Sequence, residues 1–240
     1  MKQLITLITI LFTSLIFSSP SWSETVSGDE LVANPSDGLV YKKFTTVPFT
    51  GSTIPTSYSP LKGSYKKGKK HGLWENFHDN GLLKSEKNFM DGKKHGVWEV
   101  FDENGQISFK TNFKDGKKDG LEQSFFKNSQ IYFKRNYKDG KQVGLYEIFS
   151  ENGHLKAKGN YKDGKKDGLW SKYYENGKLD SKGKWKDGKK EGVWDSFFYT
   201  GELGWKGTYK DGKREGVLKI FIKDGSLNRT ETWKNDYKIK

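Results

Sequence analysis

The stretch YKDGKKDGLW, residues 161–170, decides the fold, because close copies of it return every 24 residues along the chain. The period runs through seven units without an insertion. Its two glycines belong to two columns with this spacing, which are Gly68, Gly92, Gly116, Gly140, Gly164, Gly188 and Gly212, and Gly72, Gly96, Gly120, Gly144, Gly168, Gly192 and Gly216. Such a period is typical of repeat proteins, whose units bury apolar faces against their neighbours. Any function is therefore expected on a surface made by repetition.

One unit has the pattern of a β-hairpin. Residues 107–113 alternate between apolar and polar side chains, which indicates a half-buried strand. Asp115-Gly116 and Gly120 then turn the chain, and residues 121–126 form the returning strand. The next turn is Asn-Gly in most units, which is a strong hairpin signal. The predicted fold class is all-β: an elongated single antiparallel sheet of stacked β-hairpin repeats, as an open, solenoid-like array with a 24-residue period.

Apolar residues recur at matched positions and form columns across the units. Two aromatic columns are Tyr65, Phe89, Phe113, Tyr137, Tyr161, Trp185, Tyr209 and Trp233, and Phe77, Phe101, Phe125, Phe149, Tyr173, Phe197 and Phe221. Two aliphatic columns are Leu73, Val97, Leu121, Leu145, Leu169, Val193 and Val217, and Leu83, Ile107, Ile131, Leu155, Leu179, Leu203 and Leu227. Ladders of this kind supply cross-strand packing and would hold a sheet together without a large core.

A further aromatic column is a candidate for partner contact. Its members are Trp74, Trp98, Tyr146, Trp170 and Trp194, and Glu122 and Leu218 interrupt it. It adjoins the column of Leu73, so strict alternation places the two on opposite faces unless a bulge intervenes. Either these rings cover the second face of the sheet or clamp neighbouring turns, or they form an exposed aromatic stripe for a partner.

Paired bases in the turns are the candidate contacts for an anionic surface. The chain carries a formal net charge of +13. The pairs are Lys69-Lys70, Lys93-Lys94, Lys117-Lys118, Lys165-Lys166, Lys189-Lys190 and Lys213-Arg214. They should recur at every second strand along one edge and form a basic comb, which could bind anionic lipid or another polyanion. Asp-Gly precedes each pair except Lys69-Lys70, and an acidic residue often follows, so solvated turns and specific protein contact remain alternatives.

The N-terminal residues indicate export. A basic start at Lys2, an apolar run over residues 4–17 and small residues around position 22 predict a signal peptide at 1–23, with an uncleaved anchor as the alternative. We expect a periplasmic or secreted protein. Residues 24–36 are assigned as a linker, 37–60 as a divergent N-terminal repeat or cap, and 61–240 as seven units plus a C-terminal partial unit. The chain has no Cys, so neither a lipidated cysteine nor a disulfide is available.

No residue pattern indicates catalysis, a cofactor or a metal. His71 and His95 occupy a turn position that is acidic in most other units, and the Asp of each Asp-Gly turn lacks the spacing of a calcium loop. The G-x-x-x-x-G-K sequences, as in residues 159–165, are followed by Lys where a phosphate-binding loop needs Ser or Thr. We predict no enzyme, no cofactor, no metal and no specific nucleic acid partner.

The recurring phrase resembles the MORN (membrane occupation and recognition nexus) repeat, in its bacterial variant. The residues that carry the resemblance are 161–170, Tyr173 and the run Asn176-Gly177-Lys178-Leu179, and the likeness covers residues 37–240. It implies β-hairpin repeats in an elongated, twisted sheet and a role in protein assembly or at membranes. Some bacterial members are labelled as antitoxins of toxin–antitoxin systems.

The resulting functional prediction is a non-enzymatic, exported repeat protein that acts as a protein-interaction scaffold. One alternative is an antitoxin or immunity protein that occludes a toxin. The other is a peripheral binder of anionic membrane surfaces, in which the basic comb contacts lipid headgroups.

Overall fold

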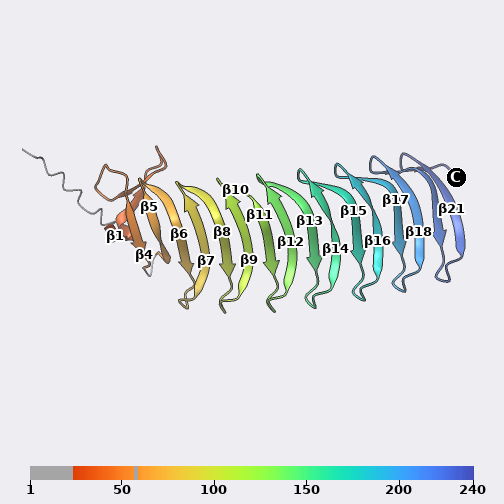
Figure 1. Ribbon diagram of the computed structural model, residues 1–240, viewed down its shortest axis with the longest axis horizontal. Coiled ribbons are helices and arrows are strands. Elements are labelled where there is room, and N and C mark those ends of the chain that lie inside the picture. The colour runs from red at the N-terminus through yellow and green to blue at the C-terminus, as the bar shows by residue number, and fades with distance from the viewer. Residues whose placement is uncertain (1–23, 57–58) are drawn as a thin grey trace, which may run out of the picture.

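The computed structural model describes residues 24–56 and 59–240; the predicted signal peptide, residues 1–23, lies outside the described residues. The described part forms an elongated row of β-hairpins (Figure 1). Its main sheet has 20 strands, and a second sheet has two. Successive hairpins add to one open, mostly antiparallel sheet with a period of about 24 residues, so the predicted fold class is confirmed.

The strands have the following bounds in chain order: β1 Glu24–Ser27, β2 Leu31–Ala33, β3 Val40–Lys42, β4 Gly51–Ile54, β5 Leu61–Lys66, β6 Lys69–Phe77, β7 Leu83–Met90, β8 Lys93–Phe101, β9 Ile107–Lys114, β10 Lys117–Lys118, β11 Gly120–Phe125, β12 Ile131–Lys138, β13 Lys141–Phe149, β14 Leu155–Lys162, β15 Lys165–Tyr173, β16 Leu179–Lys186, β17 Lys189–Phe197, β18 Leu203–Lys210, β19 Lys213–Arg214, β20 Gly216–Phe221, β21 Leu227–Lys234 and β22 Tyr237–Lys238. A short 3-10 helix, η1, spans Gly28–Glu30. From β4 onward each strand pairs antiparallel with the next one along the chain, with β10 and β11 both on β9, and β19 and β20 both on β18.

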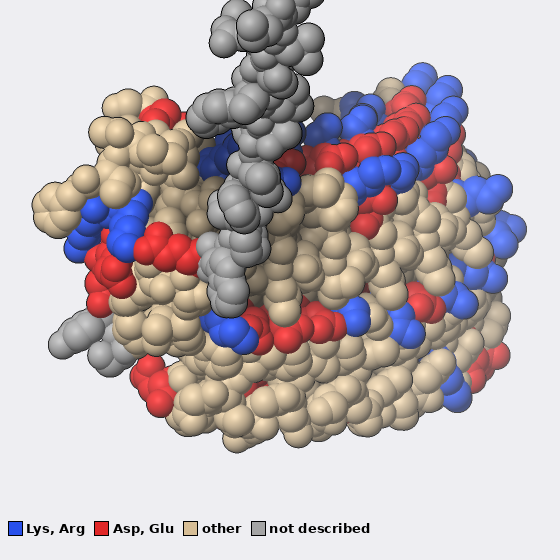
Figure 2. Space-filling model, turned by 60° about the vertical axis from the view of Figure 1, so that its left-hand side comes forward, with Lys and Arg blue, Asp and Glu red and all other residues tan. Residues whose placement is uncertain are grey.

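The Asp-Gly turns are two-residue loops with both central residues at positive φ. In the loop after β7, Asp91 has φ 49° and Gly92 has φ 83°. This conformation matches the twist of antiparallel strands and favours Asp-Gly. Because the loop is so short, the residues on either side of it are direct partners, as in Lys162 and Lys165. Figure 2 shows the consequence, rows of basic side chains beside rows of acidic side chains along the array.

The Asn-Gly turns are longer than the two-residue loop that Asn-Gly most strongly favours. The His78 amide donates to the Leu82 carbonyl at 2.8 Å and the Gly81 amide to the His78 carbonyl at 2.9 Å, which encloses three residues. Only the glycine has positive φ, at 81°. The Asn80 side chain donates to the Glu103 carbonyl of the next turn at 2.8 Å. Asn is therefore placed where it joins neighbouring hairpins.

A bulge at the second glycine column fixes which way the following side chains point. Asn160 pairs with Asp167 and Lys158 with Ser171, so Gly168, Leu169 and Trp170 stand opposite one residue. Gly168 has φ 83°, which glycine adopts without strain. After it, alternation places Leu169 and Trp170 on opposite faces, at 55% and 6% exposure. We call the face of Trp170 the tryptophan face and that of Leu169 the aliphatic face.

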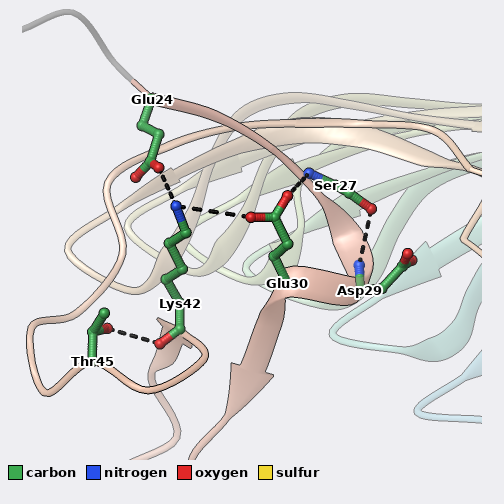
Figure 3. Close-up of polar contacts among 6 residues, drawn as sticks. All are labelled: Glu24, Ser27, Asp29, Glu30, Lys42 and Thr45. Atoms are coloured by element: carbon green, nitrogen blue, oxygen red, sulfur yellow. Dashed lines mark hydrogen bonds and ion pairs between the residues drawn. The ribbon is translucent and has the colours of Figure 1, made fainter.

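The N-terminal segment forms a cap whose first strand lies parallel to its partner. β1 pairs with β4 in parallel, and β2 pairs with β3 in the small sheet. Val26 and Phe49 are buried there. The Lys42 ammonium contacts the carboxylates of Glu24 and, at 3.8 Å, Glu30 (Figure 3). Residues 24–36, which the sequence assigned to a linker, are therefore part of the cap, because apolar and charged contacts hold them to residues 40–54.

No helix in the described ranges is long and apolar enough to cross a membrane, since the one helical segment there, η1, has three residues.

Candidate functional site: the two faces and the basic turns

Three tryptophans of the Trp170 column, Trp74, Trp170 and Trp194, each lie over a glycine of the neighbouring strand. Trp170 is the cross-strand partner of Gly183, and its indole N–H donates to the Asn160 carbonyl at 3.0 Å. A Cβ added to Gly159 would lie 2.1 Å from the Trp170 ring, and one added to Gly183 would lie 2.1 Å from that of Trp194. These glycines are needed because no side chain fits beneath the rings.

The candidate aromatic contacts are mostly interior residues. Trp74, Trp170 and Trp194 are only 4%, 6% and 6% exposed. Trp98 and Tyr146 are half-buried. They pack edge to face with the column of Tyr65, for example Tyr65 with Trp74 at 4.8 Å between ring centroids and Tyr161 with Trp170 at 5.4 Å. The column therefore covers the second face of the sheet and offers a partner little ring surface.

The two members of each basic pair differ in position. The second base lies over the rings of the tryptophan face: the Lys166 ammonium is 4.2 Å from the Trp170 ring centroid and 4.7 Å from that of Trp185. The same arrangement recurs at Lys70, Lys94, Lys190 and Arg214. The stems of these bases cover aromatic surface, and the cations gain from the electron-rich ring faces. The sequence did not separate the two bases, because nothing in a turn pattern tells which one folds inward.

Partial burial lowers the pKa of several of the bases that face the aromatic rings. Burial lowers the pKa of the Lys70, Lys166 and Lys190 ammonium groups. For Lys190, repulsion from Lys172, Arg214 and Lys166 lowers the pKa further. Lys166, Lys172, Lys190 and Arg214 therefore lie close enough to repel one another on the tryptophan face of the last units.

The first member of each pair is exposed at the turn edge: Lys69, Lys93, Lys117, Lys165, Lys189 and Lys213. Most of these residues stand directly opposite another lysine, as Lys189 does opposite Lys186. Acidic residues lie close by, and the Lys138 ammonium is 3.1 Å from the Asp119 carboxylate. The basic comb along the edge thus contains one base of each predicted pair, and carboxylates lie between these bases.

An ion cluster replaces the tryptophan at Glu122. This carboxylate is 0% exposed and contacts the Lys118 ammonium and the Arg135 guanidinium. The Thr111 hydroxyl donates to it at 3.3 Å. Arg135 and Thr111 occupy the column that is glycine beside Trp170, so the charges fill the space of a ring. The sequence showed the interruption at Glu122, and the simultaneous loss of glycine at Arg135 was the signal that could have revealed the cluster.

On the aliphatic face, one row of Leu and Val side chains remains accessible. Its members are Leu73, Val97, Leu121, Leu145, Leu169, Val193 and Val217, each between 36% and 55% exposed. Ion pairs lie beside the row, such as Lys62 with Glu75 at 2.7 Å and Lys110 with Glu99 at 2.6 Å. The sequence predicted that this column supplies cross-strand packing, whereas the structure places it at the surface.

The histidines and the Asp column do not assemble a metal site. His71 Nδ1 lies 3.4 Å from the Asp91 carboxylate, within neighbouring turns. Over residues 24–56 and 59–240, no three His, Cys, Asp or Glu side chains come together as metal ligands would.

Together with the open sheet, these features define the class of protein: it is an elongated β-hairpin repeat protein, and columns of packed aromatic side chains join its units. Five consecutive segments, residues 70–91, 94–115, 118–139, 142–163 and 166–187, match the MORN repeat variant. The chain is a MORN repeat protein, from a family that is generally non-catalytic, and no catalytic family was identified in it. No curated protein matches the chain significantly.

Proposed function

We propose that the protein is a non-enzymatic scaffold that binds another protein through its aliphatic face. The observation that carries this proposal is the row of seven exposed Leu and Val side chains at 24-residue intervals. The sheet buries these residues only in part, because each keeps at least about a third of its surface in water. Exposed apolar side chains aligned along one face offer contact points to a partner.

The charges beside the row also favour a protein partner. Glu99 and Lys110 neutralise each other, and Asp195 lies 3.5 Å from the Lys206 ammonium and 3.9 Å from that of Lys182. A partner on this face meets apolar side chains bordered by paired charges rather than a field of one sign. Protein interfaces have such an apolar centre and polar rim.

We also propose two more specific functions as alternatives. An antitoxin or immunity protein is a scaffold whose partner is a toxin, and the row could serve to occlude it. A peripheral binder of anionic membranes would use the exposed turn bases, each contributing roughly 1 kcal/mol near a charged surface. The apolar and basic pattern of residues 1–23 supports export to the periplasm or the exterior in either case.

Site-specific photo-crosslinking tests the scaffold. A photoreactive residue replaces Leu169 on the aliphatic face or, as the matched control, exposed Lys172 on the tryptophan face, in the full chain inside the producing cells. We expect one discrete protein adduct from position 169 alone, and its loss when Leu145 and Val193 are changed to Ser. Adducts with lipid only, or the same adducts from both positions, would contradict the proposal.

A second arm separates the membrane reading from the scaffold. Changing Lys165, Lys189 and Lys213 to Glu reverses exposed turn charges and leaves the aliphatic row intact. If the scaffold proposal is right, the adduct at position 169 persists in this variant. Loss of the adduct together with loss of binding to phosphatidylglycerol vesicles would favour the membrane reading.

A further inference from the structure

A hollow of about 400 Å³ lies on the tryptophan face of the last units. It is lined by Lys166, Lys172 and Lys190 and by Trp185 and Trp205, among other residues. Its volume falls within the range of small-molecule sites, roughly 300–1,000 Å³. The scaffold proposed above uses the opposite face, so this hollow calls for a separate explanation.

The hollow lies where two columns of the tryptophan face both carry short side chains. The residues of these two columns vary along the chain. They are Val100, Phe109, Phe133 and Ile148 at four central positions, Ser124 and Ala157 at two others, and Trp205 and Ile220 further along the chain. At the hollow the equivalent positions are Ser181 and Ser196, cross-strand partners on β16 and β17. Both serines line the hollow, so their short side chains leave room and provide hydroxyl groups.

The bases that line the hollow are not paired with the one carboxylate that lines it, that of Asp180. Among the described residues, no ion pair within 4.0 Å involves Lys166, Lys172 or Lys190, although Asp180 also lines the hollow. Several lysines on the aliphatic face are paired, as Lys182 is with Asp195. The pKa values of Lys166 and Lys190 are lowered by burial and by the charge of Lys172. An anion in the hollow would relieve this repulsion.

The hollow also presents aromatic surface. Trp185 and Trp205 are half-buried, in contrast to the buried Trp170 and Trp194, so part of each indole can meet a ligand. Aromatic faces pack against the C–H side of a sugar ring, while hydroxyls and ammonium groups bind its polar edge. A charge on the sugar would match the lysines.

We propose that this hollow is a binding site for an acidic saccharide. The carboxylate binds between Lys166, Lys172 and Lys190, one side of the sugar ring packs on Trp185 and Trp205, and the hydroxyls of Ser181 and Ser196 bond to those of the sugar. The ligand can be a free acidic sugar or a residue of an anionic polysaccharide, since both present the same group. Binding requires no covalent step.

Calorimetric titration of the full chain tests the site, with trigalacturonate as the probe and neutral galactotriose and citrate as controls. We expect trigalacturonate to bind, and galactotriose and citrate to bind at least about tenfold more weakly. Changing exposed Lys172 to Ala should weaken binding by about tenfold, because a charged contact is lost. The matched control is Lys158→Ala, which removes an exposed lysine from the aliphatic face and should leave binding unchanged.

Other results would overturn the proposal. Equal binding of citrate would show that charge alone is recognised, and equal binding of galactotriose would show that charge is not. The same loss from Lys158→Ala as from Lys172→Ala would indicate a diffuse charge effect. Comparing trigalacturonate with a long polygalacturonate distinguishes the two sources, because a polymer bound through several units gains affinity and a free sugar site does not.

Discussion

Around Trp170 the tryptophan face consists of one large ring between two glycines, whereas around Glu122 it consists of a carboxylate between a threonine and an arginine. Both central side chains are buried. Strand pairing continues through both regions, with Glu122 opposite Arg135 just as Trp170 is opposite Gly183. The units therefore preserve the filling of space across neighbouring strands and not the identity of any one residue.

The two regions differ in how their stability depends on single residues. The indole ring of Trp170 is held by packing and by one hydrogen bond from its N–H group. Glu122 is held by two cations and a hydroxyl, and each cation is itself largely withdrawn from water, at 30% and 32% side-chain exposure. A buried ion cluster adds little over a well-packed apolar core, yet it is strongly destabilised when one partner is removed.

Removing the buried carboxylate should have the largest effect. Glu122→Ala leaves Lys118 and Arg135 without their counter-charge and opens a cavity. We expect a loss of about 3–5 kcal/mol in the free energy of unfolding. Denaturant unfolding followed by tryptophan fluorescence measures it. A loss below about 1 kcal/mol would show that water or a neighbouring carboxylate replaces the cluster.

Converting the ion cluster into the ring arrangement should reverse that loss. The triple variant Thr111→Gly, Glu122→Trp and Arg135→Gly reproduces the residues around Trp170, and Lys118 can then lie over the introduced ring as Lys166 does. We expect a stability equal to that of the wild type or higher by about 1–4 kcal/mol. If the triple variant is no more stable than Glu122→Ala, the two regions are not interchangeable.

Filling the space beneath a ring should cost less. In Gly183→Ala the added Cβ would lie 2.1 Å from the Trp194 ring, so the ring must move, and we expect a loss of about 1–3 kcal/mol. Gly204→Ala is the matched control, because the nearest atom to its Cβ is 3.5 Å away. Thermal unfolding should separate the two variants, and equal melting temperatures would contradict the packing role of Gly183.

Much of the fold could be predicted because local rules decide it. The Asp-Gly turns, the alternation in residues 107–113 and the 24-residue period all follow from backbone conformation and strand geometry. The parallel pairing of β1 with β4 could not be predicted, because it depends on contacts outside the repeat. The three-residue form of the Asn-Gly turns was also hidden, since the same dipeptide serves both loop lengths.

The candidate sites were harder to predict, because they depend on which face a side chain occupies. The bulge at Gly168 decides that Leu169 is exposed and Trp170 is buried. The inward fold of Lys166 onto Trp170 follows only once those rings are placed. Glu122 and Arg135 both depart from the repeat pattern and contact each other, but they lie on different strands. Only the pairing register shows that they meet.

The smallest effect is expected at Glu231, where an ion cluster lies near the last strands of the sheet. Its carboxylate accepts from Arg229 at 3.1 Å, Lys238 at 3.0 Å and the Trp233 indole at 3.3 Å. The bonds from Lys238 and Arg229 lower the pKa of Glu231 from its usual 4.5. A carboxyl with a lowered pKa stabilises the folded state above its unfolded pKa and loses this contribution as the pH falls.

Glu231→Gln should therefore reduce stability at pH 7, and by less than Glu122→Ala does, because the mutant amide still accepts hydrogen bonds and fewer strands lie beyond it. The difference from the wild type should shrink as the pH falls below 4.5 and vanish once the carboxyl is protonated in both states. Urea unfolding at several pH values between 7 and 3 measures this. A difference that stays constant over that range would mean that Glu231 acts through packing and not through its charge.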